Sequence, residues 1–307
     1  TRRRMFISMA QLQLEMFALM LIGFFCKKRG IINDSAVQSL SDLLINVILP
    51  CNILTGFTGG VEVSNDLMRN CLLAILFSFI IQMIAIYSSK LLFKKSPLEK
   101  ANVASYGMIV SNSSFIGLPV VERAYANLGI LYTAFFQIPI RFTMWSAGLA
   151  LFTSVNKRDA FKKIMLHPCV IACELGFAMM LLKLTFPGFL GQTVIAVSRC
   201  TTPVSMLAVG AILADTDYKK VLHLDVLFFC LLRLVIFPVL VYACLLAAHV
   251  DKVLTGVTVL LTAMPAGSTT AILPKKYGCD AEYGASLVFT STLLSMLTIP
   301  VFALFLA

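Results

Sequence analysis

Two short segments combine proline and glycine with small polar residues inside long apolar runs. The first reads Ser-Asn-Ser-Ser-Phe-Ile-Gly-Leu-Pro over residues 111–119, and the second reads Met-Pro-Ala-Gly-Ser-Thr-Thr-Ala-Ile-Leu-Pro over residues 264–274. Proline removes a backbone donor and glycine weakens a helix, so each segment predicts a break in a helix. Inside a bilayer, broken helical backbone is tolerated only where it is buried in protein or lines a cavity. The half-helix after a break presents free N–H groups and a positive dipole end, which favours an anionic ligand.

The side chains at these breaks, together with two intramembrane arginines, form the candidate substrate site. Asn112 supplies an amide donor, and the stretch 267–269 lets backbone approach closely and adds hydroxyls. An arginine within a membrane is costly and is a functional candidate by default; it could bind a carboxylate, form a structural ion pair or snorkel. The predicted substrate-binding residues are Asn112, Ser113, Ser114, Gly267, Ser268, Thr269, Arg233 and Arg141, and the residues that shape the breaks are Gly117, Pro119 and Pro265. The simpler alternative is a pair of proline kinks without a ligand.

The composition indicates the class of protein and the kind of secondary structure that carries these residues. Of the 307 residues, 59% are hydrophobic and 13% are charged, and the mean hydropathy is +0.90. A soluble domain is roughly half apolar and about a quarter charged. The chain is therefore predicted to be an all-α integral membrane protein, which excludes an ordinary soluble enzyme, a disordered protein and a nucleic-acid-binding domain. The net charge of +10 is interpreted as charge on cytoplasmic loops.

The sequence predicts no enzyme, cofactor or metal site. It contains no H-E-x-x-H motif, no G-x-S-x-G motif and no intramembrane aspartate pair. Its 9 cysteines are scattered, mostly in apolar runs, and none of them forms a C-x-x-C pair. We interpret them as small buried hydrophobic residues without disulfides.

Hydropathy and loop signals predict ten transmembrane helices. A bilayer core about 30 Å thick needs about 20 apolar residues for each span. The predicted spans are 5–26, 36–58, 69–92, 100–121, 127–153, 163–185, 191–214, 221–248, 252–276 and 281–306. The odd-numbered loops carry 15 lysines and arginines and the even-numbered loops carry 4. This bias predicts a multi-pass plasma-membrane protein with cytoplasmic odd loops and both termini outside, although the basic tail at residues 2–4 argues for the opposite orientation.

The two halves of the chain resemble each other. Residues 21–24 resemble residues 174–177, and Pro50 matches Pro203, both at an offset of 153. Leu118-Pro119 matches Leu273-Pro274 at an offset of 155, which is again close to half the length of the chain. The offset predicts two five-helix repeats, residues 1–153 and 154–307. Because five is odd, the second copy must be inverted, which is typical of secondary transporters.

Residues 111–119 resemble the N-T-x-F-x-G-L-P stretch of the auxin efflux carrier family. The segments 203–210, 264–266 and 291–300 are similar to that family's seventh, ninth and tenth helices. The resemblance implies a 5+5 inverted fold, like that of plant auxin exporters and bile-acid sodium symporters, in which broken helices 4 and 9 cross. A transport domain of helices 3–5 and 8–10 then moves against a scaffold of helices 1, 2, 6 and 7, which often dimerises.

One departure from the plant exporters concerns the centre of the chain. Only about 10 residues, 154–163, join the halves, where the plant exporters have a long cytoplasmic loop. This resembles the short bacterial branch, whose members are associated with malate, malonate and other small carboxylates.

The expected function is a secondary transporter that moves small organic anions, auxin-like or dicarboxylate, by alternating access. One alternative is a sodium-coupled symporter that uses the hydroxyls and freed carbonyls at the breaks, although the breaks carry no carboxylate. Another is a sensor or channel on the same fold that does not transport substrate. The expected partners are a small organic anion, the lipid bilayer, H⁺ or Na⁺ as a coupling ion, and a second copy of the chain.

Overall fold

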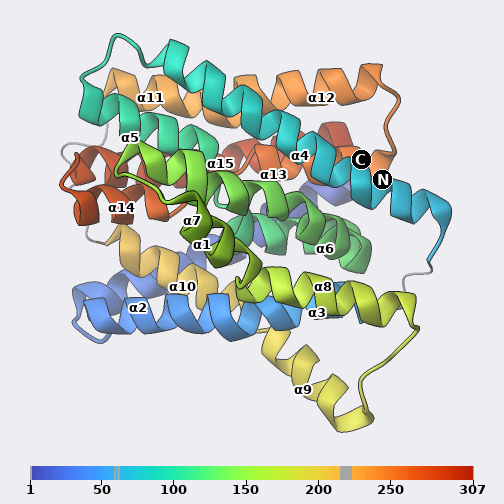
Figure 1. Ribbon diagram of the computed structural model, residues 1–307. Helices are drawn as coiled ribbons and strands as arrows, with labels where there is room; N and C mark the ends of the chain where they lie inside the picture. Colours follow the sequence, from blue (N-terminus) through green and yellow to red (C-terminus); the bar gives the residue numbers. More distant parts are fainter. Residues whose placement is uncertain (1, 59, 61–62, 215–222, 307) are drawn as a thin grey trace.

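The computed structural model describes all residues except 1, 59, 61–62, 215–222 and 307, and in the described part the chain is built from helices (Figure 1). The first half contains α1 (Arg2–Lys28), α2 (Asp34–Leu43), η1 (Leu44–Ile48), α3 (Leu49–Thr58), α4 (Asn65–Leu92), α5 (Leu98–Ile109), η2 (Ser113–Gly117), α6 (Leu118–Thr143), η3 (Met144–Gly148) and η4 (Leu149–Leu151). The second half contains α7 (Lys157–Met165), α8 (Pro168–Leu181), α9 (Gly188–Ser198), α10 (Thr201–Leu213), α11 (Leu224–Leu231), η6 (Leu232–Ile236), α12 (Phe237–Ala247), α13 (Lys252–Thr262), α14 (Thr269–Tyr277) and α15 (Ala281–Leu306).

Six helical segments of the described chain are long and apolar enough to cross a bilayer. They are Phe6–Lys28, Asp34–Thr58, Asn65–Leu92, Gly188–Leu213, Leu224–Ala247 and Ala281–Leu306. The remaining predicted spans fall on helices that are broken, kinked or shorter. Within α6 the backbone turns at Ala126, where φ is 49° and ψ is −139°. This kink lies where the sequence predicted the connection between the fourth and fifth helices.

Local sequence explains where several helices begin. The Asn33 side chain accepts a hydrogen bond from the Ala36 N–H at 2.8 Å and caps α2. Pro97 precedes α5, and Pro168 occupies the first turn of α8. The predicted span 163–185 needs a correction, because residues 163–165 belong to the separate helix α7. Proline at position 168 suits only the first turn of a helix, so a new helix begins there.

The chain passes back and forth between the two ends of the helix bundle (Figure 1). The turns from α1 to α2, from α4 to α5 and from α14 to α15 lie at one end, at the left of the view. The turns from α8 to α9 and from α12 to α13 lie at the other end, where both termini are marked. Lysines and arginines that the sequence places in odd-numbered loops, such as Lys28, Lys94 and Lys276, therefore gather at one end, which we call the basic end.

Glycine permits close packing between two pairs of helices. A Cβ on Gly210 of α10 would overlap the backbone carbonyl of Met20 in α1, and a Cβ on Gly23 would overlap the backbone of Leu207. In the second pair, Gly176 of α8 faces the ring of Phe57 in α3, at 2.6 Å from the position of a Cβ. Small residues of this kind let membrane helices approach until their backbones touch.

The α1–α10 contact gives a first prediction. Gly210→Ala should lower the free energy of unfolding by about 1–3 kcal/mol, the usual cost of overpacking, because backbone atoms cannot move aside as a flexible side chain can. The measurement is thermal unfolding of the purified protein in a mild detergent. Gly191→Ala in α9 is the matched control, because its nearest neighbour would lie at an ordinary 3.6 Å. Equal melting temperatures for both variants and the parent would contradict the prediction.

Candidate ligand-binding site

The two predicted helix breaks meet in the interior of the protein. Ser111 and Ala266 form an isolated antiparallel bridge. The Asn112 N–H donates to the Pro265 carbonyl at 2.8 Å, and the Gly267 N–H donates to the Val110 carbonyl at 2.9 Å. Each unwound strand thus supplies the backbone partners that the other lacks, as an apolar environment requires. We call this arrangement the crossing.

A half-helix begins on each side of the crossing. In η2, the Ile116 and Gly117 N–H groups donate back to the Asn112 carbonyl, so the N–H groups of residues 113–115 lie ahead of the first helical hydrogen bonds. In the second break, the Thr270 N–H donates to the Gly267 carbonyl as α14 begins. Both half-helices therefore turn their positive ends toward the crossing.

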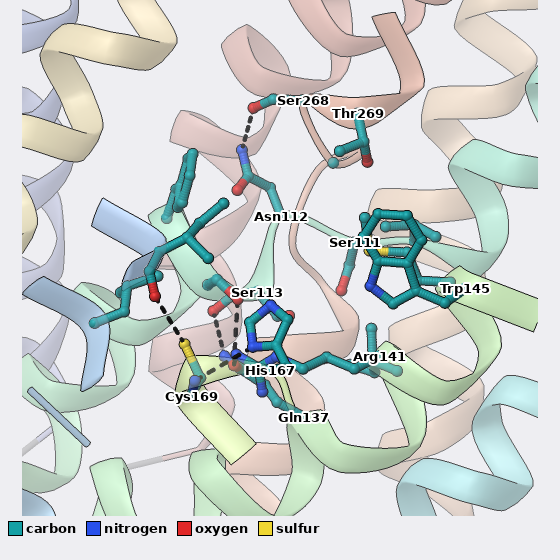
Figure 2. Close-up of a pocket in the computed structure, with 18 residues that line it drawn as sticks. Ser111, Asn112, Ser113, Gln137, Arg141, Trp145, His167, Cys169, Ser268 and Thr269 are labelled. Atoms are coloured by element: carbon teal, nitrogen blue, oxygen red, sulfur yellow. Dashed lines mark hydrogen bonds between the residues drawn. The ribbon is translucent and has the colours of Figure 1, made fainter. Parts of the chain in front are cut away.

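A cavity of about 150 Å³ lies beside the crossing. Most of the predicted site residues line it, together with side chains from η1, α3, α6, η3 and the start of α8 (Figure 2). Its polar lining residues are Ser111, Asn112, Ser113, Ser114, Gln137, Arg141, His167, Gly267, Ser268 and Thr269, and its apolar wall contains Ile45, Leu49, Val110, Phe115, Ile140, Met144, Trp145 and Cys169. The structure thus brings seven of the eight predicted substrate-binding residues to one cavity.

Asn112 and its neighbours bridge the two half-helices across this cavity. The Asn112 side chain is 5% exposed, and its Nδ2 lies 3.5 Å from Oγ of Ser268 (Figure 2). The Tyr106 hydroxyl donates to Oγ1 of Thr269 at 3.1 Å and fixes the start of α14. An amide and two hydroxyls therefore stand next to the half-helix N-termini, a donor-rich surface.

Arg141 supplies the positive charge of the cavity. Its Nη2 donates to Oε1 of Gln137 at 2.8 Å, and Nε2 of Gln137 donates to the Ser113 carbonyl at 3.1 Å. Oγ of Ser114 donates to the same Gln137 oxygen at 3.2 Å. The guanidinium is only 6% exposed, yet in the part of the chain that the structure describes no carboxylate forms an ion pair with it. A buried cation without an anionic partner favours binding of an anion.

Arg233, which was also predicted to bind substrate, does not line this cavity. It is 3% exposed, its Nε donates to the Met264 carbonyl at 3.0 Å, and its Nη1 donates to the Met108 carbonyl at 2.7 Å. These carbonyls belong to the last turn of α5 and to the residues just after α13, where each break leaves acceptors without helical partners. The guanidinium therefore holds the negative ends of both half-helices together, a structural role that a linear sequence does not reveal.

Gly117, Pro119 and Pro265 take the predicted positions around the breaks. A Cβ on Gly117 would lie 2.9 Å from Leu261 and 3.0 Å from Met264, so this glycine lets η2 pass close to the second break. Pro119 lies just after η2 at the start of α6, and the Phe115 carbonyl four residues before it accepts a hydrogen bond from the Ser205 hydroxyl at 3.2 Å. Pro265 contributes the carbonyl that Asn112 binds.

Eleven cavity residues were not among the predicted site residues, and they include Gln137, Trp145, His167 and Cys169. The sequence did contain a signal for Gln137. It lies four residues before Arg141 in an apolar run, so the two side chains share a helix face. His167 accepts a hydrogen bond from the Cys169 N–H through Nδ1 at 3.3 Å and caps α8. The positions of Trp145 and His167 at the cavity depend on how η3 and α8 pack, which local sequence does not determine.

The chain matches known proteins over nearly its whole length. A family model described as membrane transport protein matches residues 7–162 and 156–303. An uncharacterized transporter of Methanothermobacter thermautotrophicus is 24% identical over 97% of this chain and 98% of its own length. An uncharacterized transporter of Methanocaldococcus jannaschii is 21% identical over 92% and 93%, and the uncharacterized transporter YfdV of Escherichia coli is 21% identical over 94% of each chain.

The position of Arg233 predicts a strong effect on stability. Arg233→Ala leaves two buried carbonyls without their charged donor, so we expect the free energy of unfolding to fall by about 3 kcal/mol or more. Thermal unfolding in detergent measures this change. The control is Arg199→Ala, because Arg199 is exposed and forms no ion pair within the described residues. If Arg233→Ala melted like the parent but no longer bound a ligand, Arg233 would belong to the binding site after all.

Proposed function

Because the chain belongs to the membrane transport protein family, we propose that it is a secondary transporter that moves small organic anions across the membrane by alternating access. One observation carries the proposal: the positive ends of two half-helices and the guanidinium of Arg141 converge on a single buried cavity. Helix N-termini and unpaired arginine both favour anions, and broken helices at mid-membrane are typical of transporter binding sites. The family's transport function is also consistent with a protein that is not an enzyme.

The cavity favours a small carboxylate. A cavity of about 150 Å³ holds a molecule of about the size of benzene. A dicarboxylate such as malate or malonate would place one carboxylate at the crossing beside Asn112 and the other near Arg141. An auxin-like anion would instead lay its ring against the apolar wall that includes Phe115 and Trp145. Both classes fit the chemistry of the lining, and a transport screen distinguishes them.

The 5+5 inverted repeat is part of the same proposal. The two residues of the bridge at the crossing, Ser111 and Ala266, are 155 positions apart, the offset of the matching Leu-Pro pairs. Gly23 in α1 and Gly176 in α8, which match at an offset of 153, both stand at close helix contacts. These contacts join the helices assigned to the scaffold, whereas the crossing belongs to the transport domain. Tight packing within the scaffold gives the transport domain a rigid surface to move against.

The accessible side of the cavity follows from its lining. Trp145 precedes the connection to α7 and His167 follows α7 directly, so the cavity lies on the side of the crossing nearer the basic end. If that end is cytoplasmic, this conformation is the inward-facing state of the transport cycle.

Sodium coupling is the weaker alternative. Freed backbone carbonyls at helix breaks are the usual ligands of a coupling Na⁺. Here the carbonyls of Met108 and Met264 accept hydrogen bonds from Arg233, so a fixed cation already neutralises them. This favours a proton as the coupling ion. A channel or a sensor would differ in producing unitary currents or ligand binding without flux.

The homodimer is likewise a proposal. The helices α2 and α9, with η1 between α2 and α3, present exposed apolar side chains such as Leu43, Val47 and Ile195. Lipid or a second copy of the chain could cover this surface, and the family resemblance favours the second copy.

Asn112→Ala tests the site directly. We expect the variant to fold normally and to bind the anion about 1.5–3 kcal/mol more weakly, the range for a hydrogen bond to a charged group. Counterflow of labelled carboxylates in proteoliposomes, with and without Na⁺ and a pH gradient, identifies the substrate and then compares the variants. The control is Asn46→Ala, because Asn46 is exposed and its Nδ2 donates only to the Asp42 carbonyl at 2.7 Å.

Two results would count against the proposal. If no carboxylate were exchanged by the parent protein under any gradient, the transport of organic anions would be refuted. If Asn112→Ala exchanged the substrate as well as Asn46→Ala did, the anion would bind elsewhere.

The orientation in the membrane is tested by labelling intact cells with an impermeant thiol reagent. In a background without native cysteines, a cysteine at Asp159 in α7 should remain unlabelled, because basic loops are retained in the cytoplasm. A cysteine at Val63, in the connection before α4, should react, because it is exposed at the opposite end. The reverse pattern would place the termini in the cytoplasm.

A further inference from the structure

A polar contact joins α3 to α6, and it lies on the opposite side of the crossing from the cavity. Nδ2 of Asn52 in α3 donates to Oε2 of Glu122 in α6 at 3.2 Å. Leu49 and Phe115 line the cavity, and Asn52 and Glu122 lie further along the same two chain segments, away from the basic end. At 1.5 Å per residue, Glu122 lies about 10 Å beyond Phe115. The contact thus lies on the side of the crossing that is farther from the basic end.

Close packing surrounds this contact. Beyond Asn52, a Cβ on Gly56 would lie 2.7 Å from the Ile130 side chain, so α3 presses directly on the second half of α6. The rings of Phe57 and Phe135 meet edge to face with centroids 5.8 Å apart. A helix assigned to the scaffold and helices assigned to the transport domain are therefore held together along this stretch.

Only one of the two polar side-chain atoms of Asn52 has a hydrogen-bond partner. The side chain is 1% exposed, and its Oδ1 is buried without a hydrogen-bond partner, whereas Glu122 is exposed on its other side. An ionised carboxylate can only accept hydrogen bonds, so it cannot serve this oxygen. A protonated carboxyl group can donate its O–H to Oδ1 while its carbonyl oxygen accepts from Nδ2. Protonation would therefore satisfy both atoms of the buried amide.

We propose that Glu122 is a proton-binding residue whose protonation stabilises the closed α3–α6 contact with Asn52. Water reaches the carboxylate from the exposed side of Glu122, so the proton comes from solvent. When the contact opens, water can bond to Oδ1 of Asn52, so the protonated carboxyl of Glu122 no longer stabilises the structure more than the ionised carboxylate does. Proton binding and closure are thus linked and must influence each other equally. Because this inference rests on the proposed function, it makes Glu122 a proton-coupling residue of the transport cycle.

The surrounding charges do not offer Glu122 another partner. The titratable groups on its own helix segment are Arg123 and Tyr125. The elements that pack against α6 carry further titratable groups. These include Cys51 on α3, Asp251 and Lys252 at the start of α13, Glu15 on α1, Asp66 and Arg69 in the first turns of α4, and Glu174 on α8. Among the residues that the structure describes, none of these forms an ion pair or a side-chain hydrogen bond with Glu122.

The test measures the α3–α6 distance as a function of pH, without any substrate. Spin labels at Thr58 and Ala124, in a background without native cysteines, report closed and open populations of the full chain in lipid nanodiscs. Between pH 8 and pH 5 the closed-to-open ratio should rise about fivefold, which corresponds to one net hydrogen bond. Glu122→Gln, which cannot ionise, should remain closed at every pH. Asn52→Leu should abolish the pH dependence while leaving Glu122 in place.

The control is Glu15→Gln, because Glu15 is a second exposed carboxylate within a predicted span and, among the described residues, forms no hydrogen bond or ion pair with Asn52. It should retain the pH response of the parent. A parent distance that does not change with pH, or a pH response that survives in Glu122→Gln, would overturn the proposal. Because the distance is measured without substrate, it remains informative even if no carboxylate is transported. If carboxylates are exchanged but the distance ignores pH, only the role of Glu122 is wrong.

Discussion

Backbone that leaves a helix inside a membrane must find hydrogen-bond partners within the protein, and this constraint organises the whole molecule. The bilayer core offers no water to the N–H and C=O groups that a break exposes. Here the two breaks resolve the problem jointly, through the Asn112–Pro265 and Gly267–Val110 backbone bonds and through Ser291, whose hydroxyl accepts from the Ala266 N–H. Because each break completes the other, neither half-helix pair could keep its position alone.

The same constraint separates the roles of the two buried arginines. The breaks expose N–H groups on one side of the crossing and carbonyls on the other, so the crossing has a positive and a negative face. Arg233 binds the negative face through the carbonyls of Met108 and Met264, so its fixed positive charge lies where the carbonyls are exposed. Arg141 lies beside the positive face, where its charge adds to the half-helix dipoles. Of the two arginines, Arg141 is therefore the one whose positive charge remains for an anionic ligand to neutralise.

The sequence predicted those features that depend on local chemistry. Proline, glycine and small polar residues locate both breaks and single out Asn112, because few other functions explain such residues in an apolar run. The same reasoning treated Arg141 and Arg233 alike, because both are cations in apolar segments. Their difference arises from contacts over long distances in the chain, such as the bond from Arg233 to Met108, and periodicity contains no information about such contacts. The kink at Ala126 and the separate helix α7 similarly depend on tertiary packing.

The proposed alternating-access mechanism requires the two sides of the crossing to differ, and in this structure they are packed differently. On one side of the crossing, η1 and α8 stand back from η2 and leave a cavity with an arginine and half-helix N-termini. On the other side, α3 closes against α6 through Gly56, the Phe57–Phe135 contact and the Asn52–Glu122 bond. To open this side, α3 must lose its hydrogen bond to the Glu122 carboxylate, which can be protonated. It must also lose its apolar contacts with α6, which do not depend on pH. In the proposed mechanism the apolar contacts set the free-energy difference between the two states, and protonation of Glu122 makes that difference depend on the pH of the solvent.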